Sequence, residues 1–406
     1  MQQIDNLENR DIIIVGQQPW DVEIGSNCKN LAVEFSKKNR VLYVNSALDR
    51  ITLYKERNTP KVQKRLQVIA HKQPGIVKIS DNLWNLFPDC LVESITWLKS
   101  RAIFNFLNKI NNRKFSDSIQ KAADELGMKN FILFNDNDMF RSYYLKDFLK
   151  PAVSIYYSRD YMLGVDYWKF HGSILEPKLI AKSDICAANS TYLANYCKKY
   201  NPSSYYVGQG CDLKMFSGYS GQSLPADMTG TPKPVIGYVG ALQSIRLDIA
   251  LLGFLARQKP EWSIVLVGPE DDTFKSSDLH GIKNIFFLGS KQPADLPAYI
   301  DSFDVCINPQ IVNEVTIGNY PRKIDEYLAM GKPVVATRTD AMSIFEEYTY
   351  LADDQGGYVE MITKALVENN AERQQSRKIF AASHTWENNV KEIYKAINAF
   401  ERAKNG

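Results

Sequence analysis

Cysteine and histidine are scarce in this sequence, with six cysteines and four histidines among 406 residues. No two cysteines form a Cys-x-x-Cys pair, and no cysteine lies in a cluster with histidine. The spacing therefore predicts neither a disulfide framework nor a zinc site. Scattered cysteines are typical of a reducing compartment, so we expect a cytoplasmic location. The histidines have no pattern around them, and His171, the one nearest a candidate site, is expected to be structural.

Long apolar runs are also lacking. No stretch approaches the ~20 apolar residues that a membrane-spanning helix needs. Residues 1–10 are polar and acidic, without a basic start or an apolar run, so we expect no signal peptide. The net charge of +3 is small and by itself says little about partners.

The length of the chain predicts two domains. Short apolar runs, such as residues 11–15 and 41–45, alternate with helical patterns, which is typical of α/β domains with parallel sheets. A segment rich in Gly, Ser, Pro and Thr predicts a linker. We therefore expect four parts: a first domain at 1–212, the linker at 213–234, a second domain at 235–385 and a terminal amphipathic helix at 386–406.

The pattern of residues 314–337 predicts a loop, then a helix that ends abruptly, then a buried strand. Pro321 suits the first turn of a helix, because its missing N–H would be unpaired there. Gly331 is expected to end the helix, and Pro333 prevents its continuation. The apolar residues of this helix share one face at i, i+3, i+4 spacing: Ile324, Tyr327 and Leu328.

The polar residues of this helix indicate a ligand site. Arg322 and Lys323 would stand at a helix start, where backbone N–H groups and cations bind phosphate. One turn further on, Glu326 could accept hydrogen bonds from a ribose diol. The preceding loop, which contains Asn319, follows an apolar strand at 305–309, and open α/β sheets bind ligands at the carboxyl ends of strands. The alternative is a solvated helix with one surface ion pair.

Further candidates for substrate binding lie after other strands. Gly16 and Gly240 each follow a short apolar run. No Gly-x-Gly-x-x-Gly motif is present, which argues against a dinucleotide fingerprint at Gly16. Arg246 is expected near the start of a helix, where a cation would hold a diphosphate. A surface cation without a ligand is the alternative for Arg246.

Acidic residues also follow strands in the first domain. Asp160 could act as a general base that takes the proton from an acceptor hydroxyl. A helix cap or an ion pair with Arg159 is the alternative role. Asp136 and Asp138 are expected to cap the helix that follows them.

Two stretches of the first domain, residues 50–72 and 97–114, are basic. The second interleaves its cations with apolar residues at helical spacing. A core-facing helix with a solvated basic face would explain this pattern. Peripheral docking on an anionic membrane surface, near a lipid-linked or polymeric acceptor, is the sharper alternative. Nucleic-acid binding is not favoured, because no recognised module accompanies the charge.

The helix-and-strand stretch resembles the signature of GT-B glycosyltransferases of the group 1 (family 4-like) type, Pro-x-Lys-x-x-Glu-Tyr-Leu-Ala-x-Gly-Lys-Pro-Val-Val-Ala. The matching residues are Pro321, Lys323, Glu326, Tyr327, Leu328, Ala329, Gly331, Lys332, Pro333, Val334, Val335 and Ala336. The sequence departs from the family at Gly318, where many members carry a second glutamate that contacts the donor sugar. We therefore expect the sugar contact to differ.

The resemblance implies an α/β fold of two Rossmann-like domains facing a cleft, with the terminal helix crossing back to the first. It also implies that Glu326 binds the donor ribose, that Lys323 and Arg246 neutralise the diphosphate, and that the enzyme needs no metal or cofactor besides its nucleotide-sugar donor. The implied activity is transfer of a sugar from a nucleotide-diphosphate donor to a hydroxyl of a glycan or lipid-linked acceptor, in cell-surface polysaccharide synthesis. A GT-B-fold nucleotide-sugar epimerase and a non-catalytic sugar-nucleotide binding protein are the alternatives.

Overall fold

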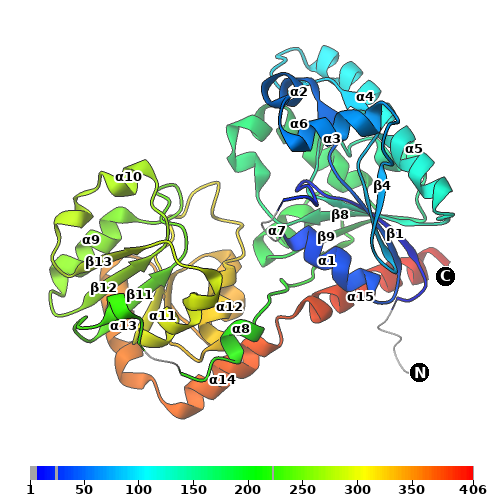
Figure 1. Cartoon of the computed structure of the whole chain (residues 1–406). Coiled ribbons are helices and arrows are strands. Elements are labelled where there is room, and N and C mark those ends of the chain that lie inside the picture. The colour runs from blue at the N-terminus through cyan, green and yellow to red at the C-terminus, as the bar shows by residue number, and fades with distance from the viewer. Residues whose placement is uncertain (1–6, 23–25, 222–223, 406) are drawn as a thin grey trace. The chain divides into compact units, whose positions relative to one another are not determined.

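The computed structural model describes residues 7–22, 26–221 and 224–405. The chain forms two compact units (Figure 1). Unit 1 combines Met1–Gly208 with Trp386–Gly406, and unit 2 is Gln209–Thr385.

Unit 1 is built on an eight-stranded sheet in the order β10-β9-β8-β7-β1-β2-β5-β4. All neighbours are parallel except β4 and β5. The strands are β1 (Asp11–Val15), β2 (Arg40–Val44), β4 (Ile76–Ser80), β5 (Leu83–Leu86), β7 (Ile132–Asp136), β8 (Val153–Ser158), β9 (Ile185–Ala188) and β10 (Ser204–Tyr206). A separate short pair joins β3 (Leu48–Asp49) to β6 (Leu91–Val92).

Helices cover both faces of this sheet, because successive strand residues point to opposite sides. In β1, Ile12 and Ile14 belong to the core shared with α1 and α15, whereas Ile13 and Val15 belong to the core shared with α4. Burial on both faces explains why the strands are continuous apolar runs. The helices are α1 (Asn27–Ser36), α2 (Arg50–Glu56), α3 (Pro60–Ile69), α4 (Arg101–Glu125), α5 (Leu145–Leu149), α6 (Asp166–Lys182), α7 (Thr191–Lys198) and α15 (Trp386–Asn405).

Unit 2 contains a six-stranded parallel sheet in the order β13-β12-β11-β14-β15-β16. Its strands are β11 (Val235–Val239), β12 (Ser263–Val267), β13 (Ile285–Gly289), β14 (Val305–Asn308), β15 (Val334–Thr337) and β16 (Tyr350–Ala352). Its helices are α8 (Lys214–Ser217), α9 (Ile249–Gln258), α10 (Asp272–Lys275), α11 (Leu296–Ser302), α12 (Arg322–Ala329), α13 (Gln355–Glu368) and α14 (Ala371–Ala382). The strand order reverses between β11 and β14, and such a switch point opens a crevice at the carboxyl ends of the two strands.

The α/β fold with two Rossmann-like regions agrees with the sequence analysis, but the expected linker does not. Residues 213–221 and 224–234 belong to unit 2, where α8 and a short 3-10 turn at Ala226–Met228 interrupt the irregular chain. Leu213, Phe216 and Met228 are buried in the same core as β11. Their apolar burial fixes a segment whose small and polar residues had suggested flexibility.

The terminal helix α15 is part of unit 1 and packs beside α1 (Figure 1). Val390, Ile393 and Ile397 are buried in its core. The ring of Tyr394 lies 5.7 Å from that of Phe35, and the Tyr394 hydroxyl accepts a 2.8 Å hydrogen bond from the Asn39 side chain.

Candidate active site

A pocket of about 440 Å³ opens at the switch point of unit 2. The loops after β11 and β14 and the first turn of α12 form its walls. Its lining brings together every candidate residue that the sequence analysis placed in the second domain: Gly240, Arg246, Asn319, Pro321, Lys323 and Glu326. Residues up to 86 positions apart in the sequence therefore share one site, as the strand-end argument predicted.

Helix α12 is held against the sheet by its apolar face. Ile324, Tyr327 and Leu328 are fully buried, as the periodicity predicted. The Tyr327 hydroxyl also accepts a 2.9 Å hydrogen bond from the backbone N–H of Val239 at the end of β11. Pro321 differs from the prediction, because it is the N-cap residue and not the first helical residue. The Pro321 side chain cannot cap the helix, so it accepts no hydrogen bond from the N–H groups in the first turn of α12.

Lys323 extends from α12 towards the glycine turn after β11. Its ammonium donates a hydrogen bond to the Tyr238 hydroxyl and lies 4.3 Å from the centre of the Tyr238 ring. Gly240 has φ +145°, and a Cβ there would lie 2.8 Å from Lys323 Nζ. A side chain at position 240 would therefore displace this cation from the pocket.

Arg322 and Glu326 have unmet hydrogen-bonding capacity at the pocket wall. Arg322 Nε is buried without an acceptor among the described residues. The Glu326 carboxylate accepts no hydrogen bond within the described part of the chain. Burial raises the pKa of Glu326, and the charges of Arg322 and Lys323 partly offset that effect. Buried polar groups normally find partners, so the Arg322 Nε, next to the partly buried Glu326 carboxylate, indicates a polar ligand.

Arg246 lines the pocket from a loop and not from a helix start. Helix α9 begins at Ile249, because Asp248 caps it through a 2.9 Å hydrogen bond from the Leu251 N–H. The segment before it is a turn anchored by Asp271, which accepts hydrogen bonds from the backbone N–H and the hydroxyl of Ser244 at 2.7 and 2.8 Å. The Arg246 side chain is exposed at the rim.

A buried polar cluster supports the pocket wall at Tyr320, and the sequence analysis missed it. Asp325 is fully buried and accepts hydrogen bonds from the Tyr320 hydroxyl at 2.8 Å and from Cys211 Sγ at 3.2 Å. His384 Nδ1 lies 2.6 Å from the other Asp325 oxygen. The sequence around His384 shows no pattern, because its partner Asp325 is 59 residues away. Its role here is to hold Asp325, and through it Tyr320.

Asp160 and Gly16 lie in unit 1. The Asp160 carboxylate forms an ion pair with Arg159, the alternative role considered above, and its side chain is 39% exposed. Arg159 Nε also donates a 2.8 Å hydrogen bond to Asp136, which is fully buried. Burial lowers the pKa of Arg159, but both carboxylates outweigh it and hold that pKa above its usual value. Gly16 is buried, and a Cβ there would lie 2.2 Å from the Tyr43 hydroxyl, so its lack of a side chain makes room for Tyr43.

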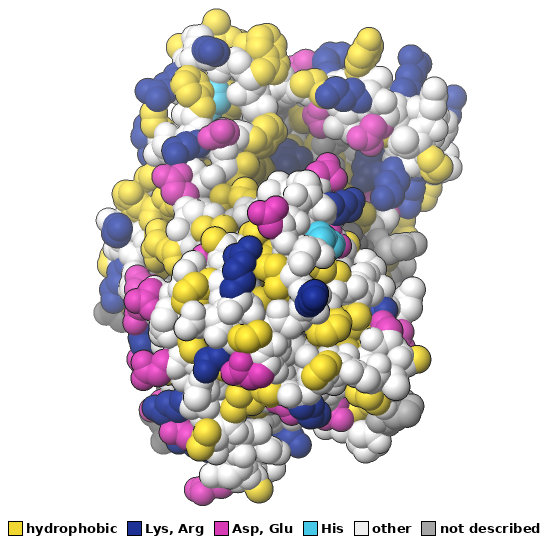
Figure 2. Space-filling model, turned by 90° about the vertical axis from the view of Figure 1, so that its left-hand side faces the viewer, with side chains coloured by type: hydrophobic (Ala, Val, Ile, Leu, Met, Phe, Trp, Pro, Cys, Tyr) yellow, Lys and Arg dark blue, Asp and Glu magenta, His cyan; other side chains and the backbone are white. Residues whose placement is uncertain are grey.

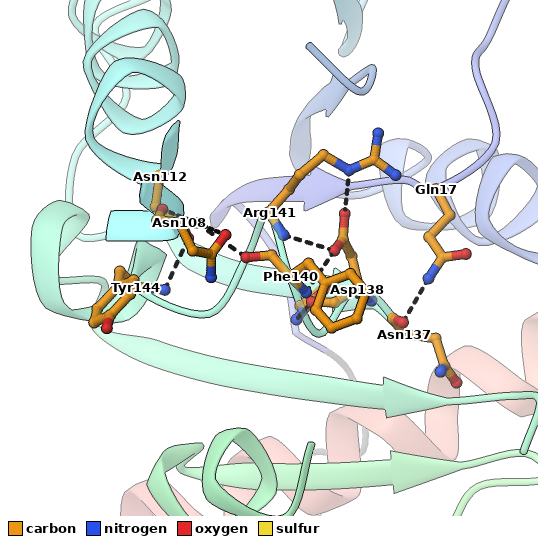
Figure 3. Close-up of polar contacts among 9 residues, drawn as sticks. Gln17, Asn108, Asn112, Asn137, Asp138, Phe140, Arg141 and Tyr144 are labelled. Carbon is orange, nitrogen blue, oxygen red and sulfur yellow. Dashed lines mark hydrogen bonds and ion pairs between the residues drawn. The ribbon is translucent and has the colours of Figure 1, made fainter. Parts of the chain in front are cut away.

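Asp136, the last residue of β7, and Asp138 do not cap a helix, contrary to the prediction. Figure 3 shows Asp138 turned towards the chain that follows it, where it accepts hydrogen bonds from the N–H groups of Phe140 and Arg141 at 3.0 and 2.9 Å and from Arg141 Nε at 3.0 Å. Asn112 of α4 donates to the Phe140 carbonyl at 2.9 Å. These four hydrogen bonds fix an irregular turn, and α5 starts only at Leu145.

His171 is structural, as expected. It stacks on Phe104 with 3.7 Å between ring centres, and its Nε2 lies 2.7 Å from the Leu98 carbonyl. Within the described residues, no group of three or more His, Cys, Asp or Glu side chains could hold a metal ion. In the same part of the chain, no helix is long and apolar enough to cross a membrane.

Comparisons with known proteins agree with this geometry. Residues 233–368 match the family described as glycosyl transferases group 1. A Bacillus subtilis (strain 168) protein that bears the name teichuronic acid biosynthesis glycosyltransferase TuaH is 26% identical over 233 residues, which are 54% of this chain and 58% of that relative. The aligned part is thus little more than half of the relative.

Solved structures share the fold at low sequence identity. HepE from Anabaena, solved in complex with UDP, is 13% identical with a TM-score of 0.64, over 96% of this chain and all of that chain. Sucrose-phosphate synthase from Thermosynechococcus elongatus is 14% identical with a TM-score of 0.64, over 97% of this chain and all of that chain. All six pocket candidates lie within the family match. The chain thus has the GT-B fold of glycosyltransferases, and its residues 233–368 match the glycosyl transferases group 1 family.

Proposed function

We propose that the chain is a glycosyltransferase that binds a nucleotide-diphosphate sugar in the pocket of unit 2. The observation that carries this proposal is the buried Arg322 Nε, which has no acceptor among the described residues, in the same pocket wall as the Glu326 carboxylate. A nucleoside diphosphate supplies both partners. Its phosphates accept hydrogen bonds from cations, and its ribose diol donates to a carboxylate.

The reaction follows from these contacts. The bond between the anomeric carbon and the diphosphate oxygen breaks, the acceptor hydroxyl oxygen bonds to that carbon, and the hydroxyl proton leaves to a base. Negative charge develops on the departing diphosphate, next to Arg322, Lys323 and the start of α12. Fixed cations and backbone N–H groups stabilise such charge without reorganisation. We infer that these groups serve in place of a metal ion, and that no other cofactor takes part.

Asp160 is our candidate for the base. It lies just after a sheet strand of unit 1, and part of its carboxylate surface is exposed. A carboxylate can accept a proton from an acceptor hydroxyl, and Arg159 holds this one in place. Gly16 remains a candidate contact for the acceptor.

We propose a glycan or lipid-linked acceptor and a role in cell-surface polysaccharide synthesis. The support is the name of the Bacillus subtilis relative, which refers to teichuronic acid biosynthesis. For the donor we propose a UDP-sugar, because HepE shares the fold and was solved with UDP and with UDP-glucose.

The donor site is tested by calorimetric titration with UDP, GDP and ADP. We expect one of them, UDP first, to bind the wild type. Glu326→Ala should weaken that binding by about 1.5–3 kcal/mol, the value of hydrogen bonds to a charged group. Glu360→Ala, at an exposed site outside the pocket, is the matched control and should bind like the wild type. If none of the three nucleotides binds, or if Glu326→Ala binds as tightly as the wild type, the donor-site assignment is wrong.

Product analysis separates transfer from epimerisation. Incubation with a UDP-sugar and acceptor glycans should release UDP and form a new glycoside. Formation of the epimeric sugar without an acceptor would instead identify an epimerase of the same fold. Nucleotide-sugar binding without any product would identify a non-catalytic binding protein.

A further inference from the structure

Large apolar side chains are exposed together at one end of unit 1. Trp97 is 68% exposed, and Ile103 and Phe106 of α4 are 52% and 66% exposed. Tyr54 of α2 and Tyr167 at the start of α6 are 88% and 58% exposed. Soluble proteins seldom gather so many large apolar side chains without a partner. We call this set, together with Phe170 of α6, the Trp97 surface.

Contacts connect the segments that carry these side chains. The Trp97 indole donates a 2.8 Å hydrogen bond to the Ser94 carbonyl, and the Ser94 hydroxyl accepts a 2.9 Å hydrogen bond from the first turn of α2 at Ile51. On the other side, the Arg101 guanidinium of α4 lies 5.5 Å from the centre of the Phe170 ring. Figure 1 accordingly shows α2, α4 and α6 at the same end of unit 1.

The apolar exposure is confined to the first half of α4. Its inner face is buried through Phe104, Phe115 and Ile119. Ile103 and Phe106 point outwards, whereas the exposed residues of the last turns are polar, such as Lys121 and Asp124. The outer face of the first half of α4 is therefore not purely basic and solvated, because it also exposes large apolar side chains.

Cations accompany the apolar side chains. Lys99, Arg101 and Lys109 are exposed beside Trp97, Ile103 and Phe106, and no acidic residue occurs between positions 97 and 114. Lys55 adds a further exposed cation on α2. In Figure 2, which keeps this end uppermost, hydrophobic side chains lie at the surface next to Lys and Arg. Exposed cations next to exposed apolar side chains are complementary to a lipid layer with negative charge at its surface and an apolar interior.

We propose that the Trp97 surface docks on an anionic phospholipid membrane. Trp97 and Tyr167 suit the headgroup region, because their rings are apolar with a polar edge. Ile103 and Phe106 enter the boundary of the acyl chains, and Lys99 and Lys109 contact the phosphates while their stems lie along apolar surface. This inference does not depend on the proposed sugar transfer.

The test is co-sedimentation of the full chain with lipid vesicles. One set contains phosphatidylcholine and phosphatidylglycerol in equal parts, and the other contains phosphatidylcholine alone. We expect binding to the anionic set and little to the neutral set, with affinity that falls as salt is added. Lys99→Glu with Lys109→Glu should weaken binding to the anionic set at least about tenfold. Trp97→Ser with Phe106→Ser should weaken binding by a similar factor and leave the salt dependence in place.

Matched controls change the same residue types elsewhere. Val367→Ser with Ile379→Ser removes two exposed apolar side chains of unit 2, and Lys283→Glu with Lys364→Glu reverses two exposed cations there. Both controls should bind the anionic vesicles like the wild type, and all variants should keep the wild-type melting temperature. The proposal is overturned if the wild type does not bind anionic vesicles at low salt, if the controls lose as much binding as the surface variants, or if the chain binds single-stranded DNA in preference to vesicles.

Discussion

Arg322 is a candidate phosphate contact that the family signature does not include. The matched pattern includes Lys323 but leaves position 322 open, and the ammonium of Lys323 already bonds to Tyr238. The Arg322 Nε, by contrast, is buried and has no acceptor among the described residues. A bound diphosphate would satisfy this donor, whereas an empty pocket leaves its desolvation uncompensated.

We therefore expect Arg322→Gln to lower the affinity for UDP by about 1.5–3 kcal/mol, the value of a hydrogen bond to a charged group. Binding of uridine, which has no phosphate, should change little. Isothermal titration calorimetry measures both, with Lys283→Gln as a control at an exposed site of unit 2. Equal losses for UDP and uridine would place Arg322 at the nucleoside instead of the phosphates.

Glu176 is a buried acid of unit 1 whose environment gives the stability a pH dependence. Its carboxylate accepts hydrogen bonds from Tyr156 at 2.6 Å and Tyr196 at 3.1 Å. Burial raises the pKa of Glu176 from its usual value of 4.5, although both tyrosine hydrogen bonds act in the opposite direction. The folded protein therefore holds this proton more tightly than the unfolded chain does.

The sign of the effect follows from that difference. The stabilisation is fully present below pH 4.5 and is lost as the pH rises through the raised pKa of the folded state. Glu176→Gln cannot titrate, so its free energy of unfolding should fall less than that of the wild type between pH 4.5 and neutral pH. Urea unfolding at a series of pH values measures the two slopes. Parallel pH profiles for the two proteins would show that Glu176 does not titrate differently in the folded state.

At the scale of elements, α12 depends on the way it ends. Gly331 has φ +75°, and the Lys332 N–H donates a 3.0 Å hydrogen bond back to the Tyr327 carbonyl. This arrangement satisfies a terminal carbonyl and turns the chain into β15. A residue with a Cβ is strained in that conformation, and here the Cβ would also lie 3.0 Å from Lys378 Cε.

We expect Gly331→Ala to destabilise unit 2 by about 1–2 kcal/mol. Gly356→Ala is the control with the opposite sign. Gly356 is an exposed helical residue of α13, where alanine should stabilise by about 0.5–1 kcal/mol. Urea unfolding followed by circular dichroism measures both changes. If Gly331→Ala proves neutral, the tight end of α12 is not required.

The same element shows how far sequence reasoning reaches. The local signals of α12, namely its apolar spacing and Gly331, predicted the helix, its buried face and its end. The two helix starts were predicted less well: Pro321 is the N-cap residue of α12 and not its first helical residue, and the cap formed by Asp248 delays the start of α9 to Ile249. The Asp325 cluster could not be predicted, since its bonds to His384 and Cys211 join residues 59 and 114 positions apart. Apolar burial of Phe216 and Met228 likewise outweighed the flexible composition of their segment.

At the scale of the whole molecule, the chain crosses between the units twice, after Gly208 and after Thr385. Within unit 2, the residues next to the two crossings are hydrogen-bonded to each other. The Cys211 N–H donates a 3.0 Å hydrogen bond to the His384 carbonyl. Both residues also contact Asp325 of α12. The segments that connect the units are therefore anchored to the helix that carries Glu326.

After the second crossing, α15 completes the core of unit 1. Ile393 is fully buried among residues of α1 and the sheet. Ile393→Ala should therefore destabilise unit 1 by about 2–5 kcal/mol, the cost of truncating a buried isoleucine. Because unit 2 has its own cores, its stability should remain unchanged.

Hydrogen exchange read out by mass spectrometry tests this division. In Ile393→Ala, the amides of β1, β7 and β8 should lose protection, while those of β11 and β14 should exchange as in the wild type. Lys391→Ala, on the outer side of α15, is the matched control and should leave both sheets unchanged. Equal loss of protection in both sheets would mean that the units unfold as one cooperative body. In that case α15 would stabilise the whole molecule, and the nucleotide affinity of unit 2 would depend on the integrity of unit 1.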